Sequence, residues 1–98
     1  MPSRTITNSA EELLLRNRER RSFIIQNEDT AIDVFIKKER RGDLTVSTTD
    51  HDHLIPAGGT LALNFEVDGT EAIQDRWTVI AASGTPRVSF FETEEIVR

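Results

Sequence analysis

The chain has 98 residues, of which 37% are hydrophobic and 30% charged, and its formal net charge is −5. A chain of this length forms one small domain that buries only about 60–65% of the surface of its unfolded state, so subunit contacts are a natural further source of stability. It contains no cysteine, which excludes disulfides and thiolate metal sites. No apolar run suits a signal peptide or a membrane span, so we expect neither.

The charge is distributed unevenly along the chain. Residues 1–41 contain nine Lys or Arg against seven Asp or Glu, whereas residues 42–98 contain three against ten, giving +2 against −7. This polarity favours head-to-tail contact between copies or docking on a charged surface, and it argues against general nucleic-acid binding by the second part. The alternative is that both parts simply carry solvated charge.

The first twenty residues predict an arm followed by a helix. Residues 1–8 are polar and without periodicity, which is typical of a flexible or extended arm. Ser9–Glu12 has the pattern of a capping box, which predicts a helix from Ala10 to about Arg20. A helix this short is marginal alone, so its three consecutive leucines need a partner. We therefore expect an arm with a helix over residues 1–20 and a β domain over residues 21–98.

The remainder of the chain predicts about seven short strands separated by turns. The expected strands are Arg21–Gln26, Ala31–Lys37, Leu44–Thr48, the second half of Leu54–Val67, Thr70–Ile73, Arg76–Ala82 and Arg87–Glu92. We expect the first two to form a hairpin, and Arg76–Ala82 to lie centrally because both of its faces are apolar. The fold class is mainly β, as an antiparallel β-sandwich or small barrel.

Leu54–Val67 has the clearest strand pattern. In its second half, Leu61, Leu63, Phe65 and Val67 alternate with less apolar residues, which is typical of a half-buried strand. Pro56 and Gly58-Gly59 precede this strand, and Asp68-Gly69 follows it as a hairpin signal. We expect the rest of the domain to be arranged around this strand.

No pattern in the chain indicates catalysis. Asp50-His51-Asp52-His53 contains zinc and iron ligand types, but no third and fourth ligand with recognised spacing follows, so a solvated loop is the preferred interpretation. There is no cysteine nucleophile and no Gly-x-Ser-x-Gly motif. We expect no enzyme activity, no cofactor and no small-molecule substrate. Trp77 lies in an apolar alternating strand, which favours a place in the core.

Basic residues gather in two short stretches. They are Arg16, Arg18, Arg20 and Arg21 in the first, and Lys37, Lys38, Arg40 and Arg41 in the second. Glu19 and Glu39 interrupt them, and no aromatic residues are interleaved to stack on bases. A solvated face or a protein interface is therefore preferred over phosphate binding.

Arg20–Asn27, Ile32–Ile36 and the turn Leu54–Gly59 before an alternating strand resemble small β-rich virion proteins of tailed bacteriophages. Such proteins are capsid decoration (cement) proteins or short head and tail components. The resemblance covers Arg20–Glu92 and implies a compact β domain bound in many copies to a shell of major capsid protein. It also implies a location in the virion, after assembly in the host cytoplasm.

Under this resemblance the expected partner is the major capsid protein or another virion protein, and the chain is expected to form a homo-oligomer. The expected contact residues are Leu13, Leu14, Leu15, Arg16, Arg18 and Arg20. Alternatives are another head or tail component, a carbohydrate- or ligand-binding β-sandwich with an exposed Trp77, and a metal-dependent module that uses His51 and His53.

Overall fold

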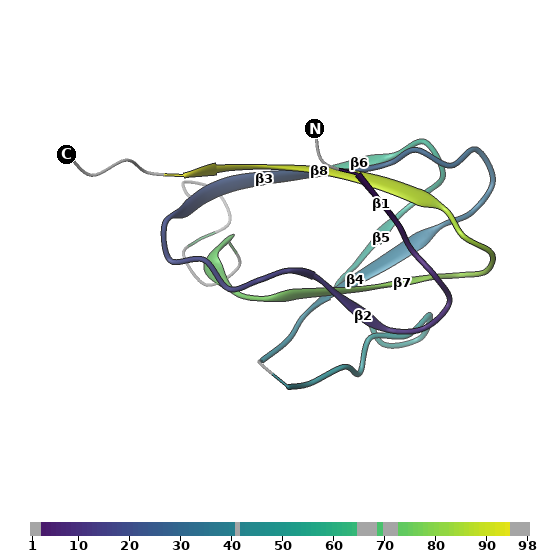
Figure 1. The fold of residues 1–98 in the computed structure, drawn as a ribbon, viewed down its shortest axis with the longest axis horizontal. Helices are drawn as coiled ribbons and strands as arrows, with labels where there is room; N and C mark the ends of the chain where they lie inside the picture. The colour runs from purple at the N-terminus through teal and green to yellow at the C-terminus, as the bar shows by residue number, and fades with distance from the viewer. Residues whose placement is uncertain (1–2, 41, 65–68, 70–72, 95–98) are drawn as a thin grey trace.

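The computed structural model of the protein describes residues 3–40, 42–64, 69 and 73–94, and it shows two four-stranded sheets packed face to face (Figure 1). Sheet A contains, in spatial order, β1 (Ser3–Thr5), β8 (Arg87–Glu94), β3 (Arg20–Asn27) and β6 (Thr60–Asn64). Sheet B contains β2 (Glu11–Leu14), β7 (Trp77–Ala81), β4 (Val34–Lys38) and β5 (His53–Ile55). All neighbouring strands are antiparallel, which confirms the expected antiparallel β-sandwich.

The predicted helix near the start of the chain is wrong. Glu11 and Glu12 instead pair with Val79 and Thr78 as part of β2. A register shift between Glu12 and Leu14 marks a β-bulge, which accounts for the burial of two consecutive leucines on one strand. Pairing with a central strand satisfies the backbone better than a short isolated helix.

The expected division of the chain at residue 20 is also absent from the structure. β1 adds an edge strand to sheet A, and β2 adds one to sheet B. The Arg4 guanidinium joins the two sheets, because it donates to the Glu12 carbonyl at 2.6 Å and lies 3.4 Å from the Glu11 carboxylate. The first residues are therefore part of the sandwich and not a separate arm.

The expected hairpin between the first two predicted strands, Arg21–Gln26 and Ala31–Lys37, is wrong as well, since β3 belongs to sheet A and β4 to sheet B. Asn27, at the end of β3, has a buried side chain that donates to the carbonyls of Ile32 at 2.8 Å and Ile55 at 3.1 Å. The Asp29 carboxylate accepts from two backbone N–H groups just beyond it. These bonds fix a crossing between the sheets where a tight hairpin was expected.

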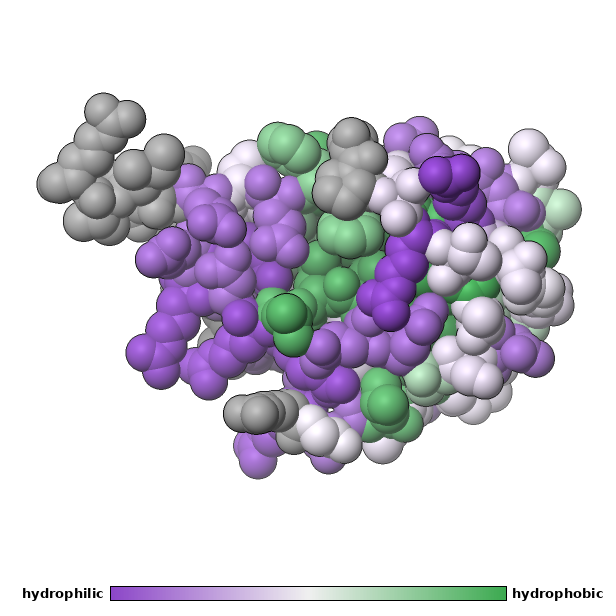
Figure 2. All heavy atoms as spheres, in the orientation of Figure 1, coloured by the Kyte–Doolittle hydropathy of each residue, from purple (hydrophilic) through white to green (hydrophobic). Residues whose placement is uncertain are grey.

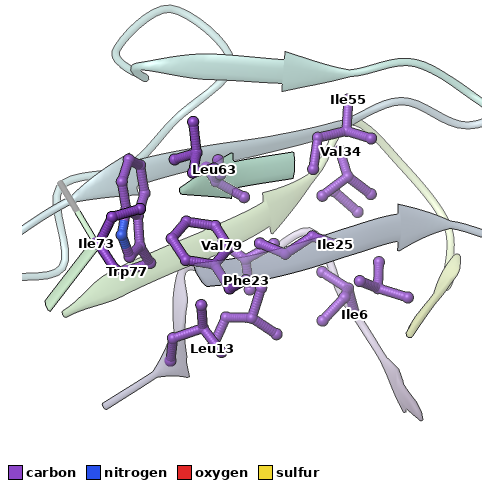
Figure 3. Packing of buried hydrophobic residues seen from close by; sticks show 14 residues of the cluster. Ile6, Leu13, Phe23, Ile25, Val34, Ile55, Leu63, Ile73, Trp77 and Val79 are labelled. Carbon is purple, nitrogen blue, oxygen red and sulfur yellow. The ribbon is translucent and has the colours of Figure 1, made fainter. Parts of the chain in front are cut away.

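The core lies between the two sheets (Figure 3). Phe23 of β3 and Trp77 of β7 meet edge to face, with ring centroids 5.7 Å apart and an interplanar angle of 61°. Trp77 is only 2% exposed, which confirms its predicted place in the core. β7 lies between β2 and β4, which confirms the central position expected for this strand.

Three other predicted segments have different outcomes. β6 confirms the strand in the second half of Leu54–Val67, with Leu63 buried, whereas residues 65–67 lie outside the described residues. The expected turn at Asp68-Gly69 is described only at Gly69, because Asp68 lies outside the described residues. The expected strand Thr70–Ile73 is described only at Ile73, which is helical and buried. Leu44–Thr48 is irregular and not a strand, although Val46 is buried.

The loop between β4 and β5 lies over the outer face of sheet B. Phe35 points outward from β4 and packs on His51, with ring centroids 4.6 Å apart, and Glu39 accepts a hydrogen bond from Thr78 of β7. The outer face of sheet B is thus largely covered by the chain itself. Among the described residues, we find no helix whose length and apolar character would let it cross a membrane.

Candidate functional site

A groove lies where the turn after β2 meets the loop after β4. It has a volume of about 970 Å³ and is lined by Glu12, Leu15, Arg16, Glu39, Arg40, Asp75 and Arg76. Figure 2 shows the surface nearby: hydrophilic residues gather over the end of β8 and the turn that joins β2 to β3, whereas apolar residues lie in the middle of this face.

The first wall of the groove is the turn from Leu15 to Glu19, which a buried arginine holds in place. Arg20 is 0% exposed, and its guanidinium donates to the carbonyl oxygens of Leu15 and Ile73, the latter at 2.8 Å. Its Nε lies 3.3 Å from the Glu92 carboxylate, which compensates the buried charge. The Asn17 N–H also donates to the Gln74 carbonyl at 2.9 Å. The turn that carries Leu15 is thus held by hydrogen bonds to buried parts of the structure.

The second wall is the turn between Arg40 and Asp43, and a second buried arginine holds it. Arg76 is 8% exposed, and its Nη1 donates to the carbonyls of Arg40 at 2.9 Å and Asp43 at 2.6 Å. Its Nε is bonded to the Glu12 carboxylate of β2. Gly42 has φ 92°, a left-handed conformation that other residues rarely adopt, so its lack of a side chain permits this turn. Arg76 therefore ties the second wall to β2.

The carboxylates of the groove are already paired with cations. Glu12 is bonded to Arg76, Glu39 lies 3.8 Å from Lys37, and Asp75 lies 3.9 Å from Lys38. Arg16 and Arg40 are different: both are exposed, and within the residues that the structure describes neither side chain has a hydrogen bond or ion pair. The groove thus offers two unpaired guanidinium groups to an incoming acceptor.

An apolar side chain stands beside these charges. Leu15 is 68% exposed, the largest exposure of any bulky hydrophobic residue among those described. Its backbone carbonyl is held by Arg20, so the side chain is presented at a fixed position. An exposed leucine next to unpaired arginines suits a partner segment that combines carboxylates with an apolar side chain.

Glu39 beneath the groove is held in its charged form. Burial by itself would raise its pKa, but hydrogen bonds from the hydroxyls of Thr45 and Thr78, the Thr45 N–H and the Lys37 charge together lower the pKa below its usual value. The hydrogen bond with Asp50, opposed by desolvation and aided by nearby carboxylates, raises the pKa of Lys37. Both groups stay ionised at neutral pH, so this network is a fixed support and not a proton donor.

Glu39 should therefore make the fold sensitive to acid. Its folded-state pKa is lowered, so its contribution to stability is complete above the unfolded pKa of about 4.3 and is lost as the pH falls through the folded value. We expect Glu39→Gln to lower the free energy of unfolding by about 1–3 kcal/mol at pH 7. The difference from the native chain should shrink by about pH 3 in urea denaturation.

The exposed Glu19 supplies the control for this measurement. Glu19→Gln removes one carboxylate without touching the network, so it should change stability by less than about 0.5 kcal/mol at either pH. An equal loss for Glu39→Gln at both pH values would show that the charge of Glu39 does not contribute.

The structure separates the residues that the sequence analysis selected as partner contacts. Leu13 and Leu14 are 6% and 1% exposed and belong to the core, so they are not accessible to a partner. Arg20 is buried beneath the turn. Leu15 and Arg16 line the groove, whereas Arg18 is exposed outside it. In the sequence Arg40 is only one member of a basic stretch, and nothing singles out Arg76.

The histidine-containing loop has other uses in the fold. The His51 ring packs on Phe35, and the His53 ring lies 5.9 Å from that of Trp77. Asp50 bonds Lys37 at 2.8 Å, and Asp52 accepts from the Lys38 N–H at 2.8 Å. Across the described parts of the chain, no three His, Asp or Glu residues are grouped so that they would hold a metal ion.

Comparison of the chain with protein-family models, with curated proteins and with solved structures gave no match.

Proposed function

We propose that the protein is a non-catalytic attachment subunit, which docks on a larger protein assembly through the groove between its two buried arginines. The partner supplies carboxylates to Arg16 and Arg40 and an apolar contact to Leu15. One observation carries this proposal: two exposed arginines without partners flank an exposed leucine, on turns that Arg20 and Arg76 hold rigidly. A site fixed in advance binds without the entropy cost of ordering its loops.

We further propose that this assembly is the head of a tailed phage, with the chain acting as a decoration protein on the major capsid protein. The support for this step is the resemblance of Arg20–Glu92 to small virion proteins, together with the sandwich fold. A groove of this size forms a small contact. On a symmetric shell, however, many copies of the protein bind side by side. When one copy contacts two neighbouring shell subunits, the two small contacts strengthen each other through avidity.

A carbohydrate- or ligand-binding sandwich is the second class of function, and it requires an exposed aromatic surface. Trp77 is buried, so the feature that would have favoured this class is missing. Phe91 is the single exposed aromatic side chain in the described part of the chain. We therefore prefer attachment to a protein partner. A role as another head or tail component, in place of a decoration protein, also belongs to this class of function.

Reconstitution on particles tests the proposal. Particles of the phage that encodes the chain, grown without it, are incubated with the purified protein, and bound copies are counted by quantitative mass spectrometry. We expect saturable binding in a fixed ratio to the major capsid protein, weakened by salt because Arg16 and Arg40 supply charge. Binding that does not saturate, or no binding, would contradict the proposal.

A further inference from the structure

Among the described residues, the outer face of sheet A is almost free of charge, in contrast to the rest of the molecule. Strand alternation and the pairing registers define the residues that point away from sheet B. They are Ser3, Thr5, Ser22, Ile24, Gln26, Thr60, Ala62, Asn64, Arg87, Phe91 and Thr93, together with Ser89, which is only 4% exposed beneath its neighbours. Of these only Arg87 is charged, in a chain of which 30% is charged. Arg87 is engaged at the margin, since it donates to Ser3 Oγ at 2.7 Å and lies 3.7 Å from Glu28.

An apolar row crosses the middle of this face. Ile24 of β3 is paired in register with Phe91 of β8 on one side and with Ala62 of β6 on the other. Ile24 is 38% exposed and Phe91 46% exposed. Neighbouring strands lie about 4.8 Å apart, so the three side chains form one continuous strip.

We infer that this face binds the same face of a second copy, so that two sandwiches stack through their A sheets as a symmetric dimer. The polar residues around the strip are hydroxyls and amides, each of which both donates and accepts hydrogen bonds. Such a surface can form hydrogen bonds with a second copy of itself. A surface of carboxylates could not, because carboxylates only accept hydrogen bonds, and ammonium groups only donate them. A two-fold axis near Ile24 would place each apolar strip against its equivalent.

Charge favours a second copy over a charged partner. Each copy carries a formal net charge of −5, so two copies repel one another, and this repulsion is smallest when they meet through a neutral face. The outer face of sheet A is such a face, and its burial removes no unpaired charge from water. The groove that is proposed to bind acidic partners is lined by Arg16 and other residues that are not on this face. The inference of a dimer therefore does not depend on the proposed function.

The size of the face sets the strength of the dimer. The four strands of sheet A have three, eight, eight and five residues, so at about 3.3 Å per residue and 4.8 Å per strand the face covers about 380 Å² on each copy. A total of about 760 Å² lies below the range of stable interfaces and suits only a weak contact. The dimer should therefore be weak and dependent on concentration.

Sedimentation equilibrium of the full chain from about 5 to about 500 μM tests the inference. We expect a monomer–dimer equilibrium that raised salt strengthens, because salt screens the repulsion between the two copies. Phe91→Thr and Ile24→Thr keep a strand-forming residue, and each should raise the dimer Kd at least about tenfold. Leu54→Thr is the matched control: Leu54 lies on β5 of sheet B and is 45% exposed, so its Kd should stay within about twofold.

Thermal unfolding establishes that each variant is folded. A chain that stays monomeric throughout the range, or assembles beyond a dimer, would overturn the inference. So would a dimer that Phe91→Thr leaves intact, or one that Leu54→Thr weakens as much as Phe91→Thr does.

Discussion

Replacement of Arg20 by alanine is expected to lower the free energy of unfolding by about 3–5 kcal/mol. The guanidinium is 0% exposed and donates to the carbonyls of Leu15, Ile73 and Asp75, and it also pairs with Glu92. Its removal leaves buried carbonyls without donors and a carboxylate without its cation, and each of these costs free energy. A domain of this size has a total stability of about 5–15 kcal/mol, so the variant is expected to be near the limit of folding.

Urea denaturation of three variants gives this expectation a clear control. Arg18→Ala removes an exposed arginine two positions away and should change stability by less than about 0.5 kcal/mol. Arg20→Lys keeps the charge but lacks the planar fork that reaches several carbonyls, so its stability should lie between those of Arg18→Ala and Arg20→Ala. If Arg20→Ala were as stable as Arg18→Ala, the buried guanidinium would not be what holds the turn.

The second large effect is expected at Leu14. Leu14→Ala should cost about 2–5 kcal/mol, since the side chain is 1% exposed and its loss leaves a cavity between the sheets. Leu15→Ala, at the next residue, should cost less than about 0.5 kcal/mol because that side chain is 68% exposed. Both substitutions remove the same atoms, so urea denaturation of the pair measures the effect of position alone.

This pair also tests the strand assignment of Glu11–Leu14. If the same residues formed an amphipathic helix, the apolar face of that helix would determine which leucines are buried, and pairing with β7 would play no part. Equal losses for Leu14→Ala and Leu15→Ala, or a larger loss for Leu15→Ala, would contradict β2 as the structure places it.

Local alternation was enough to predict much of the sandwich. In β3 and β6 buried side chains alternate with more exposed ones, so each strand could be located from its own residues. The central position of β7 followed from apolar residues on both of its faces. Trp77 in the core followed from the same pattern.

The failures arose where long-range pairing overrides local pattern. Ser9–Glu12 matches a capping box, but β2 gains more by pairing with β7, more than sixty residues away in the sequence. Leu13 and Leu14 do not alternate, because a bulge turns both inward. The hairpin expected after β3 fails because Asn27 binds the carbonyl of Ile32 in the segment that crosses to sheet B and that of Ile55 on β5 of sheet B.

The groove was the least predictable feature, because its parts come from distant segments. Arg76 bonds the carbonyls of Arg40 and Asp43, and Arg20 bonds that of Ile73; each pair is more than thirty residues apart. No spacing in the sequence reveals such contacts. The sequence does show an excess of arginines in the first part of the chain, but only the structure distinguishes those that hold the fold from those left unpaired.

A comparison of Arg16→Glu with Arg18→Glu in the particle-binding assay tests whether the protein attaches through the groove. Each variant reverses one exposed arginine in the same turn, but only Arg16 lines the groove. We expect Arg16→Glu to lower the number of bound copies at least about tenfold, and Arg18→Glu to stay within about twofold of the native chain. Equal binding by the two variants, whether both retained or both lost, would contradict attachment through the groove.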